Sequence, residues 1–255
     1  MFTDVAYDEY KGFRRANFKF EGRDSIALIP ENPTAERRWI WRAEFFGAFD
    51  TADIEMARRG WYVVWHGVSD MYGCPESVEL MERFRRAVCG SEEDGGLGLY
   101  RRTVLFGFSR GGLYSVNYAA AYPDNVSALY LDAPVLDIRS WPGGKYSGIG
   151  APKCWEECMR WYHLDEESAK TFDRNPLDRA GDIARAKIPT LIIAGGADKD
   201  VPAEENACRF VPAMREAGGF CELWIKPDCA HHPHSLVSGA PIADFVERWA
   251  LADKK

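Results

Sequence analysis

A serine between two glycines is the feature of this sequence with the clearest chemistry. Residues 103–108 form an apolar, β-rich run, G-x-S-x-G occupies residues 107–111 with Ser109 at its centre, and helix-forming residues follow. A serine on such a strand-to-helix turn sits in a strained backbone conformation with its oxygen above the sheet. We expect side chains at Gly107 and Gly111 to collide with the turn. The pattern indicates a nucleophilic serine.

A nucleophilic serine needs a base to take its proton, and the base needs an acid to orient it. Two later segments offer such groups. Residues 226–235 hold three of the five histidines, and the segment Gly-Gly-Ala-Asp-Lys-Asp-Val-Pro at residues 195–202 holds two aspartates next to a predicted strand. A third aspartate, Asp132, follows another predicted strand.

Strand and helix patterns alternate along most of the chain, which predicts a parallel sheet covered by helices on both faces. A polar turn at residues 21–24 separates the first two strands, which predicts an edge hairpin. The predicted strands are residues 15–20, 25–29, 38–41, 61–65, 103–108, 126–131, 190–194 and 220–225. The predicted helices include residues 51–59, 76–89, 154–162, 180–186, 203–217 and 241–250.

Eight strands, with the G-x-S-x-G turn after the fifth, resemble the α/β-hydrolase fold over nearly the whole chain. The resemblance implies one α/β domain over residues 1–255, with a mostly parallel eight-stranded sheet and a small lid insertion at about residues 138–175. Residues 138–175 interrupt the strand–helix alternation, as an insertion would.

The same resemblance implies the chain order nucleophile, acid, base. Asp198 matches the acid, four residues before Pro202, with Asp200 and then Asp132 as fallbacks. The base of this family usually follows a small residue directly, which matches Ala230-His231. His232 and His234 stay open as alternatives, because adjacent side chains point in different directions.

The oxyanion hole of this family takes one donor from the residue after the nucleophile, here the N–H of Arg110. The second donor is expected in the loop after the third predicted strand, at Arg42 or Ala43. The pair His66-Gly67 resembles a motif of many esterases, but it follows the fourth predicted strand. We therefore interpret it as a decoy.

The predicted lid and its surroundings supply candidate substrate contacts. An aromatic wall against an acyl group or sugar ring would come from Trp141, Trp155 and Trp161, and Glu44 is a further candidate beside Arg42 and Arg110. The tryptophans on predicted strands are expected in the core: Trp39, Trp41, Trp61 and Trp65.

Composition excludes several classes of function. A net charge of −7 disfavours nucleic-acid binding, and no apolar run approaches a membrane span. The acidic start does not resemble a signal peptide, so we expect a cytoplasmic protein. The seven cysteines form no C-x-x-C pair and are expected to be free thiols. The three clustered histidines suggest a metal as a rival interpretation, but no H-E-x-x-H motif accompanies them, so we expect no metal or other cofactor.

The leading hypothesis is a serine hydrolase that cleaves a small-molecule carboxylic ester, with a short acyl or sugar-linked group, through an acyl-enzyme. Ser109 would attack, His231 would carry the proton and Asp198 would orient the imidazole. The alternatives are a peptidase or amidase of the same fold, and a non-catalytic member that binds a ligand.

Overall fold

A single sheet of nine strands runs through the computed structural model, which describes residues 1–252. The last three residues of the predicted domain, 253–255, lie outside the described residues. The sheet order is β1-β2-β3-β5-β4-β6-β7-β8-β9. The strands are β1 (Phe2–Tyr10), β2 (Phe13–Phe20), β3 (Arg23–Ile29), β4 (Trp39–Arg42), β5 (Tyr62–His66), β6 (Thr103–Phe108), β7 (Val126–Asp132), β8 (Thr190–Gly195) and β9 (Cys221–Lys226).

The sheet changes from antiparallel to parallel at β5. Strands β1, β2 and β3 form an antiparallel meander, and β3 pairs antiparallel with β5. All later neighbours pair in parallel, with Trp41 of β4 opposite Leu105 of β6 and Leu105 opposite Leu129 of β7. The carboxyl ends of the parallel strands therefore meet at one edge, where ligands bind in open α/β sheets.

The structure has one strand more than the eight we predict, so the G-x-S-x-G turn follows the sixth strand and not the fifth. The additional strand is β1. Its residues from Thr3 to Glu9 are exposed, so its sequence lacks the alternation of apolar and polar residues that marks a half-buried strand. Its backbone ladder with β2, from Phe2 opposite Phe20 to Tyr10 opposite Phe13, holds it instead.

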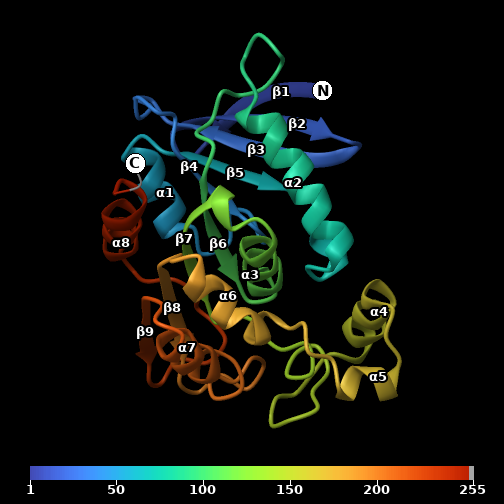
Figure 1. Cartoon of the computed structure of the whole chain (residues 1–255). Coiled ribbons are helices and arrows are strands. Elements are labelled where there is room, and N and C mark those ends of the chain that lie inside the picture. The colour runs from blue at the N-terminus through green and yellow to red at the C-terminus, as the bar shows by residue number, and fades with distance from the viewer. Residues whose placement is uncertain (253–255) are drawn as a thin grey trace.

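Helices cover both faces of the sheet, as the alternating pattern predicts (Figure 1). Helices α2, α3, α6 and α7 lie on one face, and α1 and α8 lie on the other, where they contact each other. The helices are α1 (Thr51–Arg58), α2 (Pro75–Cys89), α3 (Gly111–Ala121), α4 (Pro152–Tyr162), α5 (Glu166–Lys170), α6 (Ala180–Arg185), α7 (Ala207–Glu216) and α8 (Ala240–Ala250), with short 3₁₀ turns at Ser69–Met71, Pro123–Asn125 and Pro176–Arg179.

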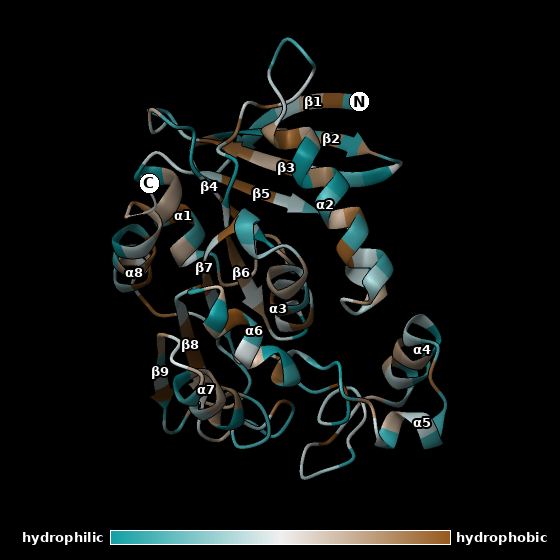
Figure 2. Cartoon of the chain, in the orientation of Figure 1, coloured by the Kyte–Doolittle hydropathy of each residue, from teal (hydrophilic) through white to brown (hydrophobic). Residues whose placement is uncertain are grey.

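The two faces of the sheet bury separate hydrophobic layers. Trp39 and Trp41 enter the layer beneath α2 and α3, while Ile40 between them enters the layer beneath α1 and α8. This alternation follows from the two-residue period of a strand. Figure 2 shows the hydrophobic colour along β5, β7 and β8 and hydrophilic patches on α2 and α8. Trp61 is also buried, whereas Trp65 is only partly covered.

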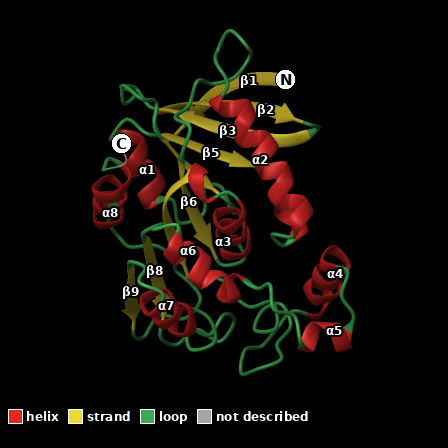
Figure 3. Cartoon of the chain, in the orientation of Figure 1, coloured by secondary structure: helices red, strands yellow, loops and turns green. Residues whose placement is uncertain are grey.

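The segment between β7 and α6 departs from the strand–helix alternation, as the sequence indicates. It carries α4 and α5, which lie at the side of the molecule and are joined to it by loops (Figure 3). Within residues 1–252, no helix is both long enough and apolar enough to cross a membrane. The seven cysteines are free thiols.

Candidate active site

Ser109 occupies the turn between β6 and α3 in a left-handed conformation, with φ of +50°. A non-glycine residue rarely adopts this conformation, so the turn must be held from outside. The Ser109 N–H donates to the carbonyl of Asp132 at 2.9 Å, and the Ser109 carbonyl accepts from the Val135 N–H at 2.9 Å. Both partners belong to the neighbouring strand β7 and the loop after it, so adjacent strands fix the serine backbone.

The glycines of the turn differ in how much space surrounds them. A Cβ at Gly107 would lie 2.6 Å from Ser115 Oγ and 2.8 Å from the Gly111 carbonyl oxygen, and a Cβ at Gly112 would lie 2.7 Å from both Pro134 Cβ and the Val135 carbonyl oxygen. At Gly111 the nearest atom would be Glu44 Cβ at 3.4 Å, an ordinary contact. The expected collision is therefore present at Gly107, absent at Gly111, and present at Gly112, where α3 meets the loop after β7.

This difference predicts unequal effects of three alanine substitutions. Gly107→Ala and Gly112→Ala should each lower the free energy of unfolding by about 1–3 kcal/mol, because neighbouring atoms must move. Gly111→Ala should be neutral or stabilise by up to about 1 kcal/mol, because alanine restricts the unfolded chain and favours the helix. Urea unfolding of the three variants measures this. Equal destabilisation by Gly111→Ala and Gly112→Ala would contradict the packing argument.

Three side chains from distant parts of the chain form one hydrogen-bonded series at the carboxyl edge of the sheet. His231 Nε2 lies 2.9 Å from Ser109 Oγ, and His231 Nδ1 lies 2.7 Å from Asp198 Oδ2. Asp198 Oδ1 accepts the backbone N–H groups of Asp200 and Val201, each at 2.9 Å. Asp198 is thus oriented by its own loop, and it bonds the imidazole through its other oxygen.

Close backbone contact between two loops explains why His231 meets Asp198. The loop after β8 carries the aspartate and the loop after β9 carries the histidine. A Cβ at Gly195 would lie 2.4 Å from the carbonyl oxygens of Cys229 and Ala230, so glycine permits the approach. The Ala197 N–H then donates to the Cys229 carbonyl at 3.0 Å. Asp200, the fallback acid, is exposed.

Beside this series lies a second buried carboxylate–imidazole pair. His234 Nδ1 lies 2.8 Å from Asp132 Oδ1, while Asp132 Oδ2 accepts from the Tyr130 hydroxyl at 2.7 Å and the Ser235 N–H at 2.9 Å. The sequence marks both Asp132 and His234 as alternatives for the site, but nothing in it indicates that they pair with each other. The structure bonds Ser109 to His231 and not to His234.

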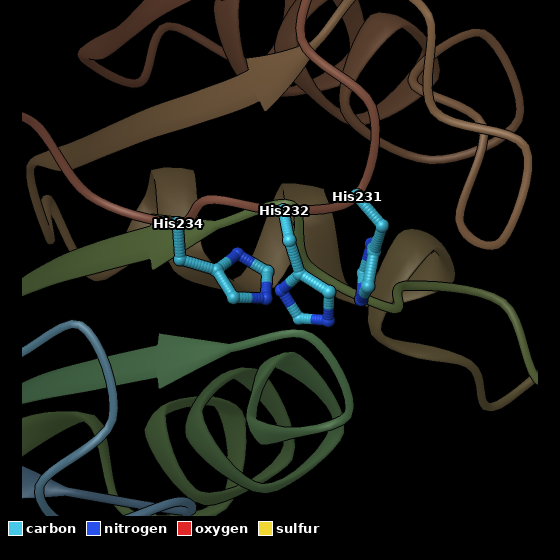
Figure 4. Close-up of side chains that lie close together, drawn as sticks. All are labelled: His231, His232 and His234. Atoms are coloured by element: carbon cyan, nitrogen blue, oxygen red, sulfur yellow. The ribbon is translucent and has the colours of Figure 1, made fainter.

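His232 is the third histidine of the loop, and it is exposed. Its ring stacks on Phe49, with ring centres 5.3 Å apart, and partial burial and the neighbouring His234 and His231 lower its pKa. Figure 4 shows the three imidazoles projecting from one stretch of chain to the same side, toward the end of β6 and the start of α3.

Of the backbone N–H groups expected to form the oxyanion hole, some are free to donate to a substrate and others are already hydrogen-bonded in the sheet. Within residues 1–252, the N–H of Arg110 makes no hydrogen bond, as a donor requires. The Ala43 N–H is already bonded to the Phe106 carbonyl at 3.0 Å, and Arg42 belongs to β4, between Trp65 of β5 and Phe106 of β6. Arg42 and Ala43 are therefore wrong as donors, because the sheet ladder extends further than the sequence pattern indicates.

Glu44 is the first residue of this loop beyond the ladder. Its backbone nitrogen lies 3.8 Å from where a Cβ at Gly111 would stand, which places it against the turn, and its N–H makes no hydrogen bond within the described chain. Sequence reasoning missed this backbone donor. A strand prediction ending one residue later would have moved the expected donor toward it.

The Arg42 side chain shapes this loop. Its fully buried guanidinium pairs with Asp53 of α1 at 2.7 Å, donates to the Glu44 carbonyl at 3.0 Å and also reaches the Ala48 carbonyl. It lies 3.5 Å above the ring of Phe108. The arginine therefore ties the backbone of the Glu44 loop to α1 and to β6, the strand that leads into Ser109.

The Glu44 carboxylate is fully buried and pairs with Arg110, with 2.9 Å between Glu44 Oε2 and Arg110 Nε. Burial raises the pKa of Glu44, and Arg110 opposes this shift. The Arg110 guanidinium also lies 5.2 Å from the ring centre of Phe45 and 5.9 Å from that of Tyr72. Arg110 thus holds Glu44 Oε2, whereas the buried Glu44 Oε1 makes no hydrogen bond within the described chain.

The three candidate tryptophans lie in different places. Trp141 stacks on Tyr72, with ring centres 6.3 Å apart, and the ring of Tyr72 also lies 5.9 Å from the Arg110 guanidinium. Trp161 lines a cavity of about 640 Å³ between α2, α3 and α4, and the buried Trp155 lines one of about 340 Å³ and donates to Glu166 at 2.7 Å. Neither cavity is lined by a residue of the Ser109–His231–Asp198 series.

The remaining histidines lie away from the site. His66 ends β5, stacks on Phe84 at 4.3 Å between ring centres and lies 2.9 Å from Ser25 Oγ. Burial lowers the pKa of His66 to about 4. Strand β4 separates β5 from β6, so the interpretation of His66-Gly67 as a decoy agrees with the sheet order. His163 is exposed beside Glu76.

Residues 94–251, more than half of the chain, match the model of the prolyl oligopeptidase family. The chain belongs to the prolyl oligopeptidase family. The matched residues include the turn with Ser109, both aspartates that bond histidines, and the histidine loop. The chain therefore has an α/β-hydrolase fold, which confirms the predicted fold class and superfamily.

One relative of this prolyl oligopeptidase family member is acylamino-acid-releasing enzyme 2 of Oryza sativa subsp. japonica, which is 26% identical over 147 residues. The match covers 54% of this chain but only 18% of the rice protein. The chain thus spans less than a fifth of that relative's length.

Solved structures share the fold at low identity. The acylaminoacyl peptidase of Pyrococcus horikoshii is 16% identical with a TM-score of 0.65, over 98% of this chain and 42% of that one. The dipeptidyl peptidase 4 of Porphyromonas gingivalis is 15% identical with a TM-score of 0.64, over 98% and 36%. The S-formylglutathione hydrolase of Agrobacterium tumefaciens is 15% identical with a TM-score of 0.61, over 96% of both chains.

Proposed function

We propose that this chain is a serine peptidase that cleaves an amide bond through an acyl-enzyme, with Ser109 as nucleophile, His231 as base and Asp198 as orienting acid. The observation that carries the proposal is the series of hydrogen bonds from Ser109 Oγ through His231 to Asp198, at 2.9 and 2.7 Å. We favour peptide-bond cleavage, the alternative hypothesis from the sequence, over ester hydrolysis because the family and the rice relative favour a peptidase.

The reaction follows from the arrangement of these groups. His231 Nε2 takes the Ser109 hydroxyl proton as Oγ bonds to the substrate carbonyl carbon, and the carbonyl electron pair moves onto oxygen. The C–N bond then breaks as the imidazolium returns the proton to the leaving amine. Water, deprotonated by the same imidazole, repeats the sequence on the acyl-enzyme and releases the acid. Asp198 stabilises the imidazolium throughout.

The backbone N–H groups of Arg110 and Glu44 are the proposed donors to the oxyanion. Both lack a hydrogen-bond partner within the described residues, and both lie at the Ser109 turn. Arg110 is also the N-cap residue of α3, whose positive dipole end favours the developing negative charge. The Arg42 network holds the Glu44 backbone in place before substrate arrives.

Ester hydrolysis is the second candidate. The enzyme from Agrobacterium tumefaciens, a hydrolase of S-formylglutathione by its name, aligns over 96% of both chains, whereas the peptidase structures extend far beyond this chain. The same nucleophile and oxyanion donors serve either leaving group, and an amide differs mainly in needing a proton on its nitrogen. A sugar-linked substrate stays a prediction.

Two substrates with one acyl group separate these candidates. We compare acetyl-alanine p-nitroanilide with the p-nitrophenyl ester of acetyl-alanine, so that only the leaving atom changes from nitrogen to oxygen. A peptidase should turn over the anilide with kcat/KM on the order of 10⁴ M⁻¹s⁻¹. Turnover of the ester alone would favour the second candidate. Failure of both substrates, with no labelling of Ser109 by a fluorophosphonate, would favour a non-catalytic ligand-binding member.

Further features of the sequence analysis stay proposals. We propose the segment of about residues 138–175 as a lid, with Trp141 as its substrate contact, because Trp141 and the Arg110 guanidinium both lie near the ring of Tyr72. Several other properties are predictions from the sequence. They are a cytoplasmic location, a single domain, a small-molecule substrate, no nucleic-acid or membrane partner, and no cofactor.

A further inference from the structure

We propose that His231, His232 and His234 bind a transition-metal ion of the zinc class, and that this ion reversibly inhibits the enzyme. The ion would be an inhibitor and not a catalytic cofactor. Its inhibitory effect rests on the proposed function, because that function makes His231 the base. Metal binding itself rests only on the geometry of the three imidazoles.

The three histidines converge on a small region. One ring nitrogen from each can be chosen so that the three nitrogens lie within 4.8 Å of one another. The ring centres of each pair are 4.8 or 4.9 Å apart. Figure 4 shows all three rings on the same side of the loop. Three imidazoles with an open fourth position form a common protein site for Zn²⁺.

The hydrogen bonds of two of these histidines prepare them as ligands. His231 and His234 each bond an aspartate through Nδ1, at 2.7 and 2.8 Å, so each carries a proton on Nδ1 and presents the lone pair of Nε2. A carboxylate that accepts the other ring N–H is the usual support of a zinc-bound histidine. The chain supplies this support twice, from Asp198 and from Asp132.

His232 completes the site by a movement of its ring. A tetrahedral Zn²⁺ with bonds of about 2.1 Å holds its nitrogens about 3.4 Å apart, so a separation of 4.8 Å must shrink by about 1.4 Å. The His232 ring is exposed and makes no hydrogen bond within residues 1–252, so its rotation changes only ring contacts: the stacking on Phe49 and the edge contacts with His231 and His234. The two buried imidazoles can keep their aspartates.

Metal binding and catalysis compete for one lone pair. His231 Nε2 accepts the Ser109 hydroxyl proton when the serine attacks, and the same nitrogen would hold the ion. No proton need be lost on binding, because the three neutral imidazoles each offer a lone pair. While the ion is bound, Ser109 has no base. We therefore expect inhibition that a chelator reverses.

The test uses the whole chain and Zn²⁺ as the probe. Micromolar Zn²⁺ should inhibit hydrolysis of whichever acyl-alanine substrate is turned over, EDTA should restore the rate, and Mg²⁺, which prefers oxygen ligands, should have no effect at the same concentration. His232→Asn should raise the half-inhibiting Zn²⁺ concentration by about tenfold or more, with kcat/KM unchanged in the absence of metal. His163→Asn, at an exposed histidine remote from the cluster, is the matched control and should change neither value.

Binding is measured separately from activity by calorimetry on Ser109→Ala, which keeps all three histidines. One Zn²⁺ should bind this inactive variant, and His232→Asn in the same background should weaken binding by about tenfold or more. Absence of Zn²⁺ binding to Ser109→Ala, or identical binding with and without His232, would overturn the metal site. Binding without inhibition of an active enzyme would instead overturn the role of His231 as base, and with it the proposed function.

Discussion

Replacement of Ser109 by alanine is expected to lower kcat/KM by about 10⁴-fold or more, because within residues 1–252 no other nucleophile is bonded to the imidazole of His231. What remains would come from binding and the oxyanion donors. The free energy of unfolding should change by no more than about 1 kcal/mol, since alanine keeps a Cβ at the same left-handed φ and loses one hydrogen bond. Steady-state assays with both acyl-alanine substrates measure kcat/KM, and urea unfolding measures the free energy of unfolding.

Ser115→Ala is the matched control for this experiment. Ser115 lies on α3, six residues after the nucleophile, and its buried hydroxyl makes no hydrogen bond in the described chain. Its removal should leave kcat/KM within about threefold and should not destabilise the protein, because an unsatisfied buried hydroxyl contributes no favourable bond. Retention of full activity by Ser109→Ala would exclude the acyl-enzyme mechanism.

Asp198→Asn is expected to lower kcat by about 10⁴-fold with little change of structure. Asp198 Oδ1 accepts two backbone N–H groups, from Asp200 and Val201. An asparagine must turn its amide oxygen to these donors, so its NH₂ group faces His231 Nδ1. The imidazole then accepts at Nδ1 and carries its proton on Nε2, where it can no longer accept the proton of Ser109. Steady-state kinetics with either substrate provides the measurement.

Asp132→Asn provides the comparison, because Asp132 also bonds the Nδ1 of a histidine. That histidine is His234, which lies in the same loop as His231. We expect kcat to stay within about tenfold of the original value, although stability should fall because the Tyr130 hydroxyl and the Ser235 N–H share this carboxylate. Asp200→Asn, at an exposed position, should change neither activity nor stability. A loss of activity in Asp132→Asn as large as in Asp198→Asn would move the acid to Asp132.

The boundaries of the oxyanion loop show where sequence patterns reach their limit. The run Trp39–Arg42 reads as apolar up to Trp41, so Arg42 is expected in a loop. In the structure Arg42 is buried, because Asp53 of α1 and several carbonyl oxygens satisfy its guanidinium. A buried arginine depends on partners that are distant in the sequence, and no local sequence pattern predicts which residues these partners are.

Strand β1 is an element that the sequence pattern does not predict at all. Its charged and exposed residues give no amphipathic signal, and the strand exists because β2 offers a free edge for backbone pairing. Hydrophobic periodicity reports which side chains are buried and not which backbones are paired. The sequence pattern therefore predicts the inner strands well and misses the outermost one.

By itself the sequence determined the fold class and the turn that holds Ser109, since a strand, a glycine-flanked serine and a helix are adjacent residues governed by local conformation. It also narrowed the acid and the base to two loops. Only the tertiary structure decided which histidine meets the serine, that Asp132 holds His234, and that Glu44 and not Ala43 has a free N–H. The physical reason is that these outcomes depend on contacts between loops and on the extent of the sheet ladder, which bring together residues far apart in the chain.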